Sequence, residues 1–191
     1  MLKTKPAKTD HPILPVIANR WSPLAFADQP VAEEQVMSLL EAARWAPSSF
    51  NEQPWRYLVG YQGDETHAKL AECLVAGNAW AKEAPVLMLS IAKNFFAYDK
   101  KPNRHYLHDV GAASAYLALQ ATELDLAVHQ MAGFSVKKAR ELFKIAEDHE
   151  PAAMIAIGHQ GDSKTLPADL QTREQGPRVR KTVAEMTWRV E

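Results

Sequence analysis

Residues 41–57 read EAARWAPSSFNEQPWRY, and this stretch constrains the fold more than any other. Just before and within it, apolar residues between Val36 and Ala43 recur at intervals of three and four, which predicts one apolar helix face. Pro47 ends that helix, because a proline disfavours the helical conformation of the residue before it. Residues 55–61 alternate and are rich in aromatic and branched side chains, which predicts a strand. A polar loop over 48–54 therefore joins a helix directly to a strand.

This loop offers hydrogen-bonding groups without charge, from Ser48, Ser49, Asn51 and Gln53. Such groups suit a heteroaromatic ring with carbonyls and ring nitrogens, or a polyol chain attached to one. Side chains of these types also satisfy the backbone of a tight connection between a helix and a strand. The residues of the loop leave both interpretations open.

The rest of the chain predicts further helices and strands on both sides of this loop. We expect Asp28 or Gln29 to cap the helix before Pro47, and Asp64 or Thr66 to cap the next one. Helices are predicted over 66–75, 104–126 and 135–145, and strands over 85–92, 127–131 and 151–158. This mixed order predicts an α+β sandwich, with helices around one sheet.

Length and composition predict one ordinary globular domain. The chain has 191 residues, of which 47% are hydrophobic and 24% are charged. We expect residues 1–15, which contain Pro6, Pro12 and Pro15, to form an extended arm and residues 16–191 to form a single domain.

Charge and hydropathy argue against two classes of partner. The formal net charge of −1 lacks the basic footprint of a dedicated nucleic-acid binder. The longest uncharged run, 110–122, is shorter than the roughly 20 residues that a membrane-spanning helix needs. No apolar segment follows the basic N-terminus, as a signal peptide would require, so we expect a cytoplasmic protein.

Several kinds of chemistry lack their motifs. Cys73 is the single cysteine, which excludes an internal disulfide and a multi-cysteine metal site. No G-x-G-x-x-G follows a predicted strand, and the glycines and lysine of 158–165 have the wrong spacing for a phosphate-binding P-loop. His105, His108 and His129 leave a metal-dependent hydrolase as one alternative.

Two segments together resemble the flavin-dependent nitroreductase family. Arg20-Trp-Ser22 followed by Phe26 matches the opening pattern of the family, and residues 46–55 match its Ala-Pro-Ser-Ser-x-Asn-x-Gln-Pro-Trp signature without a gap. Weaker matches continue along the chain, so that the resemblance covers about residues 17–183: Gly77-Asn78, Ala84-Pro85, Asp109-Val-Gly111, Gly133, Ile157-Gly158 and Arg178-x-Arg180.

The resemblance implies a fold and a set of cofactor contacts. The fold is a three-layer α+β sandwich, with a mixed, mostly antiparallel sheet flanked by helices and a long central helix. Arg20 and Arg180, with Arg178 as a further candidate, are expected to hold the phosphate of FMN. This agrees with the residues themselves, because without a glycine-rich cradle a phosphate must be held by arginines.

The remaining implied contacts concern the flavin ring and its edges. The loop after Pro47 is expected to reach a flavin bound mainly by the other subunit of a homodimer, so that FMN lies at the subunit interface. Asn78 is expected at the ring edge, and Gly133 is expected to let the backbone approach the ring. Trp80 is either part of the core or an aromatic wall over the flavin. The full set of candidate cofactor-binding residues is Arg20, Trp21, Ser22, Pro47, Ser48, Ser49, Asn51, Gln53, Asn78, Ala132, Gly133, Arg178 and Arg180.

The activity that the resemblance implies is that of an FMN-dependent oxidoreductase. NADH or NADPH would reduce the flavin by hydride transfer, and nitroaromatics, quinones or similar flat acceptors would reoxidise it in a ping-pong cycle. Ala132 stands where many relatives carry an acidic residue, and Trp21 replaces a basic or small one. No side chain is assigned as catalytic. The alternatives are another reaction on the same fold (dehydrogenation, dehalogenation or flavin breakdown) and a non-catalytic flavin-binding protein.

Overall fold

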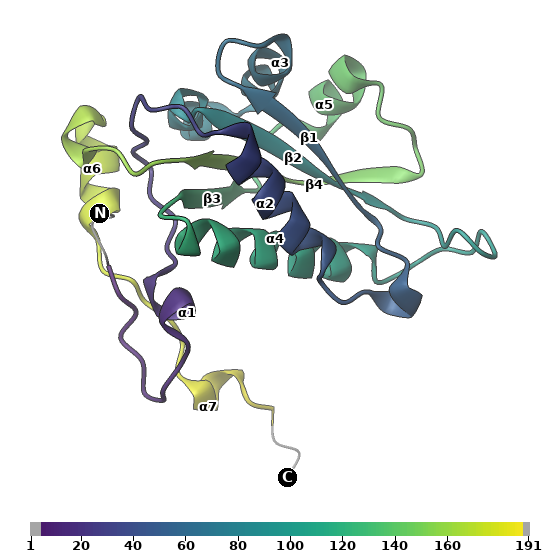
Figure 1. Ribbon diagram of the computed structural model, residues 1–191, viewed down its shortest axis with the longest axis horizontal. Coiled ribbons are helices and arrows are strands. Elements are labelled where there is room, and N and C mark those ends of the chain that lie inside the picture. Colours follow the sequence, from purple (N-terminus) through teal and green to yellow (C-terminus); the bar gives the residue numbers. More distant parts are fainter. Residues whose placement is uncertain (1–4, 189–191) are drawn as a thin grey trace.

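A four-stranded sheet forms the middle layer of the protein (Figure 1). The computed structural model describes residues 5–188. The strands lie in the order β1-β2-β4-β3 and every pairing is antiparallel, so no parallel pair occurs among the described strands. The strands are β1 (Trp55–Tyr61), β2 (Val86–Lys93), β3 (Ala127–Met131) and β4 (His149–Gly158). The predicted α+β class with a mostly antiparallel sheet is confirmed.

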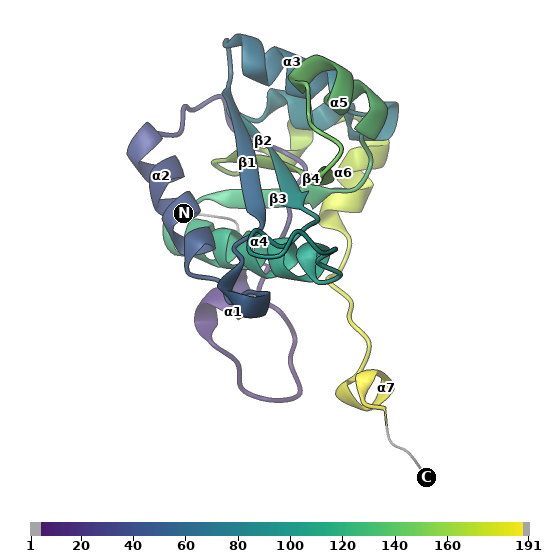
Figure 2. The ribbon, with the colours of Figure 1, turned by 90° about the vertical axis from the view of Figure 1, so that its right-hand side faces the viewer.

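Helices cover both faces of this sheet (Figures 1 and 2). On one face lie α2 (Glu33–Arg44) and the long α4 (Tyr106–Glu123). On the other lie α3 (Glu65–Cys73), α5 (Val136–Phe143) and the 3-10 segment η2 (Ala76–Glu83). Seven of the eight residues of β2 are buried, because its side chains point alternately into these two layers.

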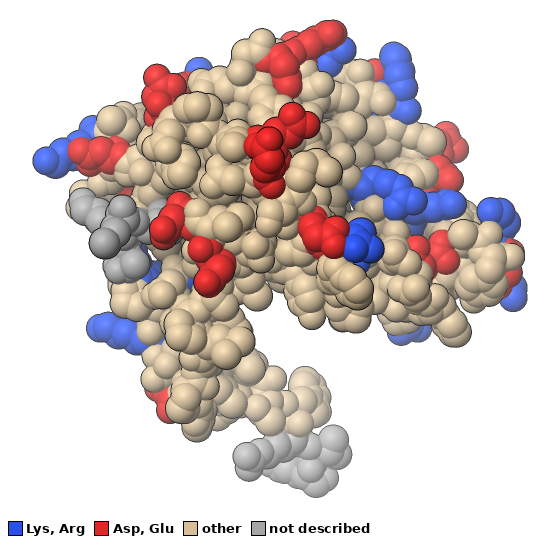
Figure 3. All heavy atoms as spheres, viewed as in Figure 1, with Lys and Arg blue, Asp and Glu red and all other residues tan. Residues whose placement is uncertain are grey.

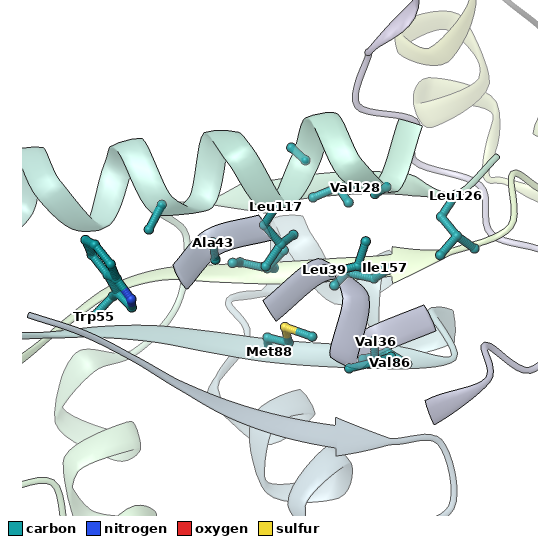
Figure 4. Close-up of a cluster of buried hydrophobic side chains, with 14 of the residues drawn as sticks. Val36, Leu39, Ala43, Trp55, Val86, Met88, Leu117, Leu126, Val128 and Ile157 are labelled. Atoms are coloured by element: carbon teal, nitrogen blue, oxygen red, sulfur yellow. The ribbon is translucent and has the colours of Figure 1, made fainter. Parts of the chain in front are cut away.

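The core beneath α2 and α4 is built from the apolar positions that the helical spacing picks out. Leu39 of α2, Leu117 of α4 and Ile157 of β4 are each fully buried and meet between the helices and the sheet (Figure 4). Burial of this kind contributes about 1.5–3 kcal/mol for each large aliphatic side chain. It fixes α4 against the sheet, and the ends of α4 in turn position the loops around it.

The predicted helix starts are partly right. Asp64 caps α3, and its Oδ1 accepts a hydrogen bond of 2.6 Å from the backbone N–H of His67. The predicted cap of α2 at Asp28 or Gln29 is wrong, because the helix begins later, after Ala32. There the side chain of Gln35 reaches back and accepts from the Ala32 N–H at 3.2 Å.

Short helical segments add to the predicted elements. They are α1 (Pro15–Asn19), η1 (Ser49–Asn51), η3 (Ser163–Thr165), α6 (Ala168–Gln175) and α7 (Val183–Met186). The segments that carry α1 and α7 both extend below the sandwich (Figure 1), and the second view shows α1 and α7 apart from each other (Figure 2). The expected arm is extended from residue 5 to 14 and then forms α1, while its first four residues lie outside the described range. Among residues 5–188, no helix combines the length and hydropathy needed to cross a bilayer.

Candidate functional site

Basic side chains from both ends of the chain line one cavity of about 230 Å³. Arg20 follows α1, Arg173 lies in α6, and Arg178 and Arg180 lie in the segment after it. The predicted residues Trp21 and Ser22 also line the cavity, and the Arg20 Nη1 donates to the Ser22 Oγ at 3.2 Å. The structure thus brings Arg20 close to the C-terminal arginines, although Arg20 and Arg178 are more than 150 positions apart.

The positive charges of this cavity repel one another. Burial lowers the pKa of Arg20, and the nearby guanidinium groups of Arg178 and Arg180 lower it further. None of the cavity's arginines forms an ion pair within the described range. Glu174 is the one carboxylate in the lining, and its burial raises its pKa, which favours the neutral form. The cavity is thus an unneutralised cationic site, suited to an anion.

Arg178 forms hydrogen bonds that connect the C-terminal segment of the chain to the N-terminal one. Its Nη1 donates to the backbone carbonyls of Lys5 at 2.5 Å and Ala18 at 2.7 Å. Its Nη2 donates to the carbonyl of Arg20 at 2.8 Å. The Lys5 ammonium in turn donates to the backbone carbonyls of Glu174 and Gly176. With these donors engaged, Arg178 shapes the cavity, while Arg20 and Arg180 are better placed to contact an anion.

Lys5 and Arg173 also line the arginine cavity, and neither was predicted from the sequence to do so. The Lys5 ammonium also lies 4.8 Å from the ring centroid of Trp21, in a cation–π arrangement. Arg173 reaches the cavity from the short helix α6, which was not predicted from the sequence. Nothing in the sequence of the N-terminal arm indicates that Lys5 docks beside α6.

His129 forms part of the wall of the same cavity. Its Nδ1 lies 2.8 Å from the carbonyl oxygen of Pro23, which can only accept, so Nδ1 carries the proton. Burial lowers the pKa of His129, and the charges of Arg173 and Arg20 lower it further, so the ring is neutral at pH 7.

The hydrolase alternative needs His129 to join His105 and His108 around a metal ion. Within residues 5–188, no three His, Cys, Asp or Glu side chains lie close enough to hold one. His108 instead contacts the carboxylate of Asp109 at 3.2 Å, and His105 precedes α4. The structure therefore gives this alternative no support.

The loop after Pro47 is shaped by its own hydrogen bonds. The Ser48 Oγ accepts from the Gln53 N–H at 3.0 Å, and the Gln53 side chain donates to the Asn51 carbonyl at 3.0 Å. Phe50, Asn51 and Gln53 all have positive φ values, of 52°, 55° and 50°. A left-handed backbone conformation costs conformational free energy in residues other than glycine. Residues strained in this way cluster at active sites and in ligand-binding loops.

Asp109 of α4 anchors this loop. Its Oδ2 accepts from the Ser49 N–H at 3.0 Å, and only 2% of its surface is exposed. The loop therefore lies at the N-terminal end of α4, whereas the arginine cavity lies at the opposite side of the molecule, near α1 and α6 (Figure 1). Within one chain, the structure does not bring Ser48, Ser49, Asn51 and Gln53 to the arginines.

Asn78 and Gly133 form a third group. The Asn78 Nδ2 donates to the Gly133 carbonyl at 3.0 Å. A Cβ at position 133 would lie 2.5 Å from that nitrogen and 3.1 Å from a methyl group of Val75. A side chain at position 133 would therefore force the Asn78 amide to move, a constraint that the sequence did not reveal. Ala132 precedes this glycine at the end of β3.

Trp80 is part of the core. It is 7% exposed, its ring is nearly parallel to that of Phe26 at 6.3 Å, and it contacts His129 at 4.7 Å between centroids. Of the two interpretations of Trp80, the structure favours the core.

Comparison with known proteins adds to this geometry. A sequence profile of the nitroreductase family matches residues 17–79 and 75–159. The chain belongs to the nitroreductase family. A putative NADH dehydrogenase/NAD(P)H nitroreductase from Streptomyces griseus is 26% identical to this family member, and the match covers 74% of this chain and 82% of that protein.

Solved structures share the fold over nearly the whole chain. An oxidoreductase containing FMN is 34% identical, with a TM-score of 0.91, and the match covers 98% of this chain and 96% of that one. A putative nitroreductase from Desulfovibrio desulfuricans, in complex with FMN, is 26% identical with a TM-score of 0.74. That match covers 96% of this chain and 99% of that one. The expected nitroreductase-like fold is confirmed.

Proposed function

We propose that this nitroreductase-family protein is an FMN-dependent oxidoreductase that uses NADH or NADPH to reduce flat conjugated acceptors. The observation that carries the proposal is the arginine cavity. It gathers unpaired guanidinium groups from Arg20 and Arg180 beside the hydroxyl of Ser22, which is a donor set for a phosphate dianion. The similar structures that contain FMN support the same cofactor here.

The donors of the cavity fit a phosphate in number and in charge. Guanidinium groups bind phosphate oxygens in pairs, and an anion would relieve the mutual repulsion that lowers the pKa of Arg20. The raised pKa of Glu174 limits the repulsion that a carboxylate would exert on the anion. A cavity of about 230 Å³ has room for a phosphate and the adjoining polyol, so the ring would extend beyond it.

Bound FMN would supply the two-electron chemistry: a hydride taken from a nicotinamide, then two electrons passed to a nitroaromatic, a quinone or a similar acceptor, in a ping-pong cycle. The chain's own residues would bind and orient. Arg20 and Arg180 hold the phosphate end. The Asn78–Gly133 contact fixes the end of β3, beside which we place the ring edge. No acidic side chain stands at position 132, so this chain offers no carboxylate there to guide the nicotinamide.

A homodimer would bring the loop after Pro47 to the partner's cofactor. In one chain this loop and the arginines are at opposite sides, and hydrogen bonds within the chain hold the loop in its conformation. The outer face of α4 is exposed at Leu107, Gly111, Ala115 and Tyr116, a largely apolar strip whose small residues permit close approach. Figure 3 shows a hollow below the sandwich, bordered by the projecting termini, where few charged side chains gather. We place the second subunit on this strip.

Binding of FMN and riboflavin to the flavin-free protein tests the proposed cofactor site. Riboflavin lacks the phosphate, so FMN should bind at least about 100-fold more tightly, as expected for two or more charge-assisted hydrogen bonds. Arg20→Ala should remove most of this preference, while Lys137→Ala, which removes an exposed positive charge on α5, should leave it intact. Equal affinities for FMN and riboflavin in the unmodified protein would contradict the proposal.

A further inference from the structure

A second cavity, of about 860 Å³, shares only Leu24 with the lining of the arginine cavity. It is an open cavity lined by η2, by residues 24–28 and by residues 160–170, which lead into α6. Its volume lies within the range of small-molecule sites, about 300–1,000 Å³. Neither the phosphate contacts nor the loop after Pro47 uses it.

Apolar and aromatic side chains form the inner wall of this second cavity. Phe26 and Trp80 line it with rings inclined by only 7°, and Leu166 and Leu170 also belong to the lining. The indole N–H of Trp80 is buried and has no hydrogen-bond partner within the described part of the chain. Because the protein itself covers this N–H, it can report changes around the ring but is not a contact for a ligand in the cavity.

The rim of this second cavity carries the opposite charge to the arginine cavity. Its lining includes four carboxylates and one ammonium group, and the carboxylates all come from exposed residues: Asp28, Glu83, Asp162 and Asp169. The ammonium is that of Lys82, which lies 3.9 Å from the Glu83 carboxylate. By contrast, the arginine cavity is lined by five cationic side chains and one carboxylate. The two cavities are therefore lined by charges of opposite sign.

We propose that the second cavity binds a small organic cation with a flat aromatic body. The body would be buried against Phe26 and Trp80, while the cationic group would lie near the rim, attracted by the carboxylates. An anion of the same shape would be repelled. The proposal concerns a site separate from the phosphate contacts and does not depend on the identity of the cofactor.

Three indole compounds of matched shape test the ligand class: tryptamine, a cation at pH 7; neutral 3-ethylindole; and anionic indole-3-propionate. Each is titrated into the purified protein while the indole N–H signal of Trp80 is followed by ¹H–¹⁵N NMR. The signal is assigned among those of the five tryptophans with Trp80→Phe. Calorimetry gives the same ranking of affinities without an assignment.

We expect tryptamine to shift the Trp80 signal saturably and to bind at least about tenfold more tightly than indole-3-propionate. Asp28→Asn combined with Glu83→Gln should weaken tryptamine binding about three- to tenfold. The control, Glu34→Gln with Glu147→Gln, removes two exposed charges away from the cavity and should not change it. No saturable shift, equal affinities for the three compounds, or equal effects of the two double variants would overturn the proposal.

Discussion

The carboxylate of Asp109, in the first turn of α4, accepts a hydrogen bond from the backbone N–H of Ser49 at 3.0 Å. This bond connects a buried carboxylate in the first turn of the long helix to the loop that carries the family signature. Asp109 belongs to one of the motifs that resemble the family, but its hydrogen-bond partner could not be predicted from the sequence. Its role is to position the loop and not to contact a reacting atom.

Replacing Asp109 tests this positioning role. Asp109→Ala leaves the Ser49 N–H without its acceptor and should lower the free energy of unfolding by about 1–3 kcal/mol. Asp109→Asn keeps an acceptor oxygen and should cost less. Urea denaturation of the two variants measures both values. Equal losses in the free energy of unfolding for the two variants would mean that the hydrogen bond to Ser49 does not explain how Asp109 stabilises the protein.

The contact between Asn78 and Gly133 predicts that the loss of stability from a substitution at Gly133 is partly recovered by a second substitution at Asn78. Gly133→Ala places a methyl group 2.5 Å from the Asn78 side-chain nitrogen, so it should destabilise the protein by about 1–3 kcal/mol. Removing that side chain with Asn78→Ala should recover part of the loss. Thermal unfolding of both single variants and the double variant gives the coupling energy, and additive effects would contradict the steric explanation.

We expect Arg178 to stabilise the contact between the N-terminal and C-terminal segments more than it contributes to cofactor binding. Arg178→Lys keeps the charge but loses the fork that reaches three carbonyls, those of Lys5, Ala18 and Arg20. Amide hydrogen exchange in residues 5–20 and 176–181 should become about tenfold faster or more. Arg180→Lys serves as the control and should leave this exchange unchanged. Unaltered exchange in Arg178→Lys would show that its bonds do not hold the termini.

If the second subunit binds the exposed strip of α4, a bulky charged residue on this strip should make the protein monomeric. Ala115 is exposed in the single chain and lies on the strip where we place the partner. Ala115→Arg should shift the mass measured by light scattering from dimer to monomer and should weaken FMN retention at micromolar protein. Ala115→Ser is the control and should remain dimeric. An Ala115→Arg dimer that retains FMN would place the interface elsewhere.

His129 should contribute to acid instability. Its folded-state pKa is lowered by burial and by the neighbouring arginines, so below its ordinary value of about 6.5 the unfolded chain binds the proton first. Stability is then complete above this pH and falls as the pH decreases, by at most about 1.4 kcal/mol per pH unit. In His129→Gln the stability should depend less on pH between 7 and 5. An unchanged slope would assign the acid sensitivity to other groups.

The strongly patterned elements could be predicted from the sequence, and the irregular ones could not. The continuous apolar run of β2 and the apolar stripe of α4 appear close to where the sequence placed them. In contrast, η2 has a 3-10 geometry without the helical period, and the start of α2 depends on Gln35 reaching back to Ala32. These features follow from tertiary contacts or from hydrogen bonds of a few residues, for which hydropathy gives no signal.

The candidate site shows the same division. Arg20 and the C-terminal arginines were predicted from a motif and from the need to bind a phosphate, and the structure brings them together. Lys5 and Arg173 were missed because each reaches the cavity through a long-range contact of an arm or a short helix. The placement of the Ser48–Asn51 part of the loop relative to the arginines depends on the subunit partner, which no single-chain pattern reveals.

Anaerobic titration of the FMN-loaded protein with NADH, and separately with NADPH, tests the central proposal most directly. We expect at least one nicotinamide to bleach the visible flavin absorbance stoichiometrically, and a quinone added afterwards to restore it. Arg20→Ala should show the same cycle only at higher FMN concentrations. A protein that binds FMN but is bleached by neither nicotinamide would contradict the proposed oxidoreductase activity.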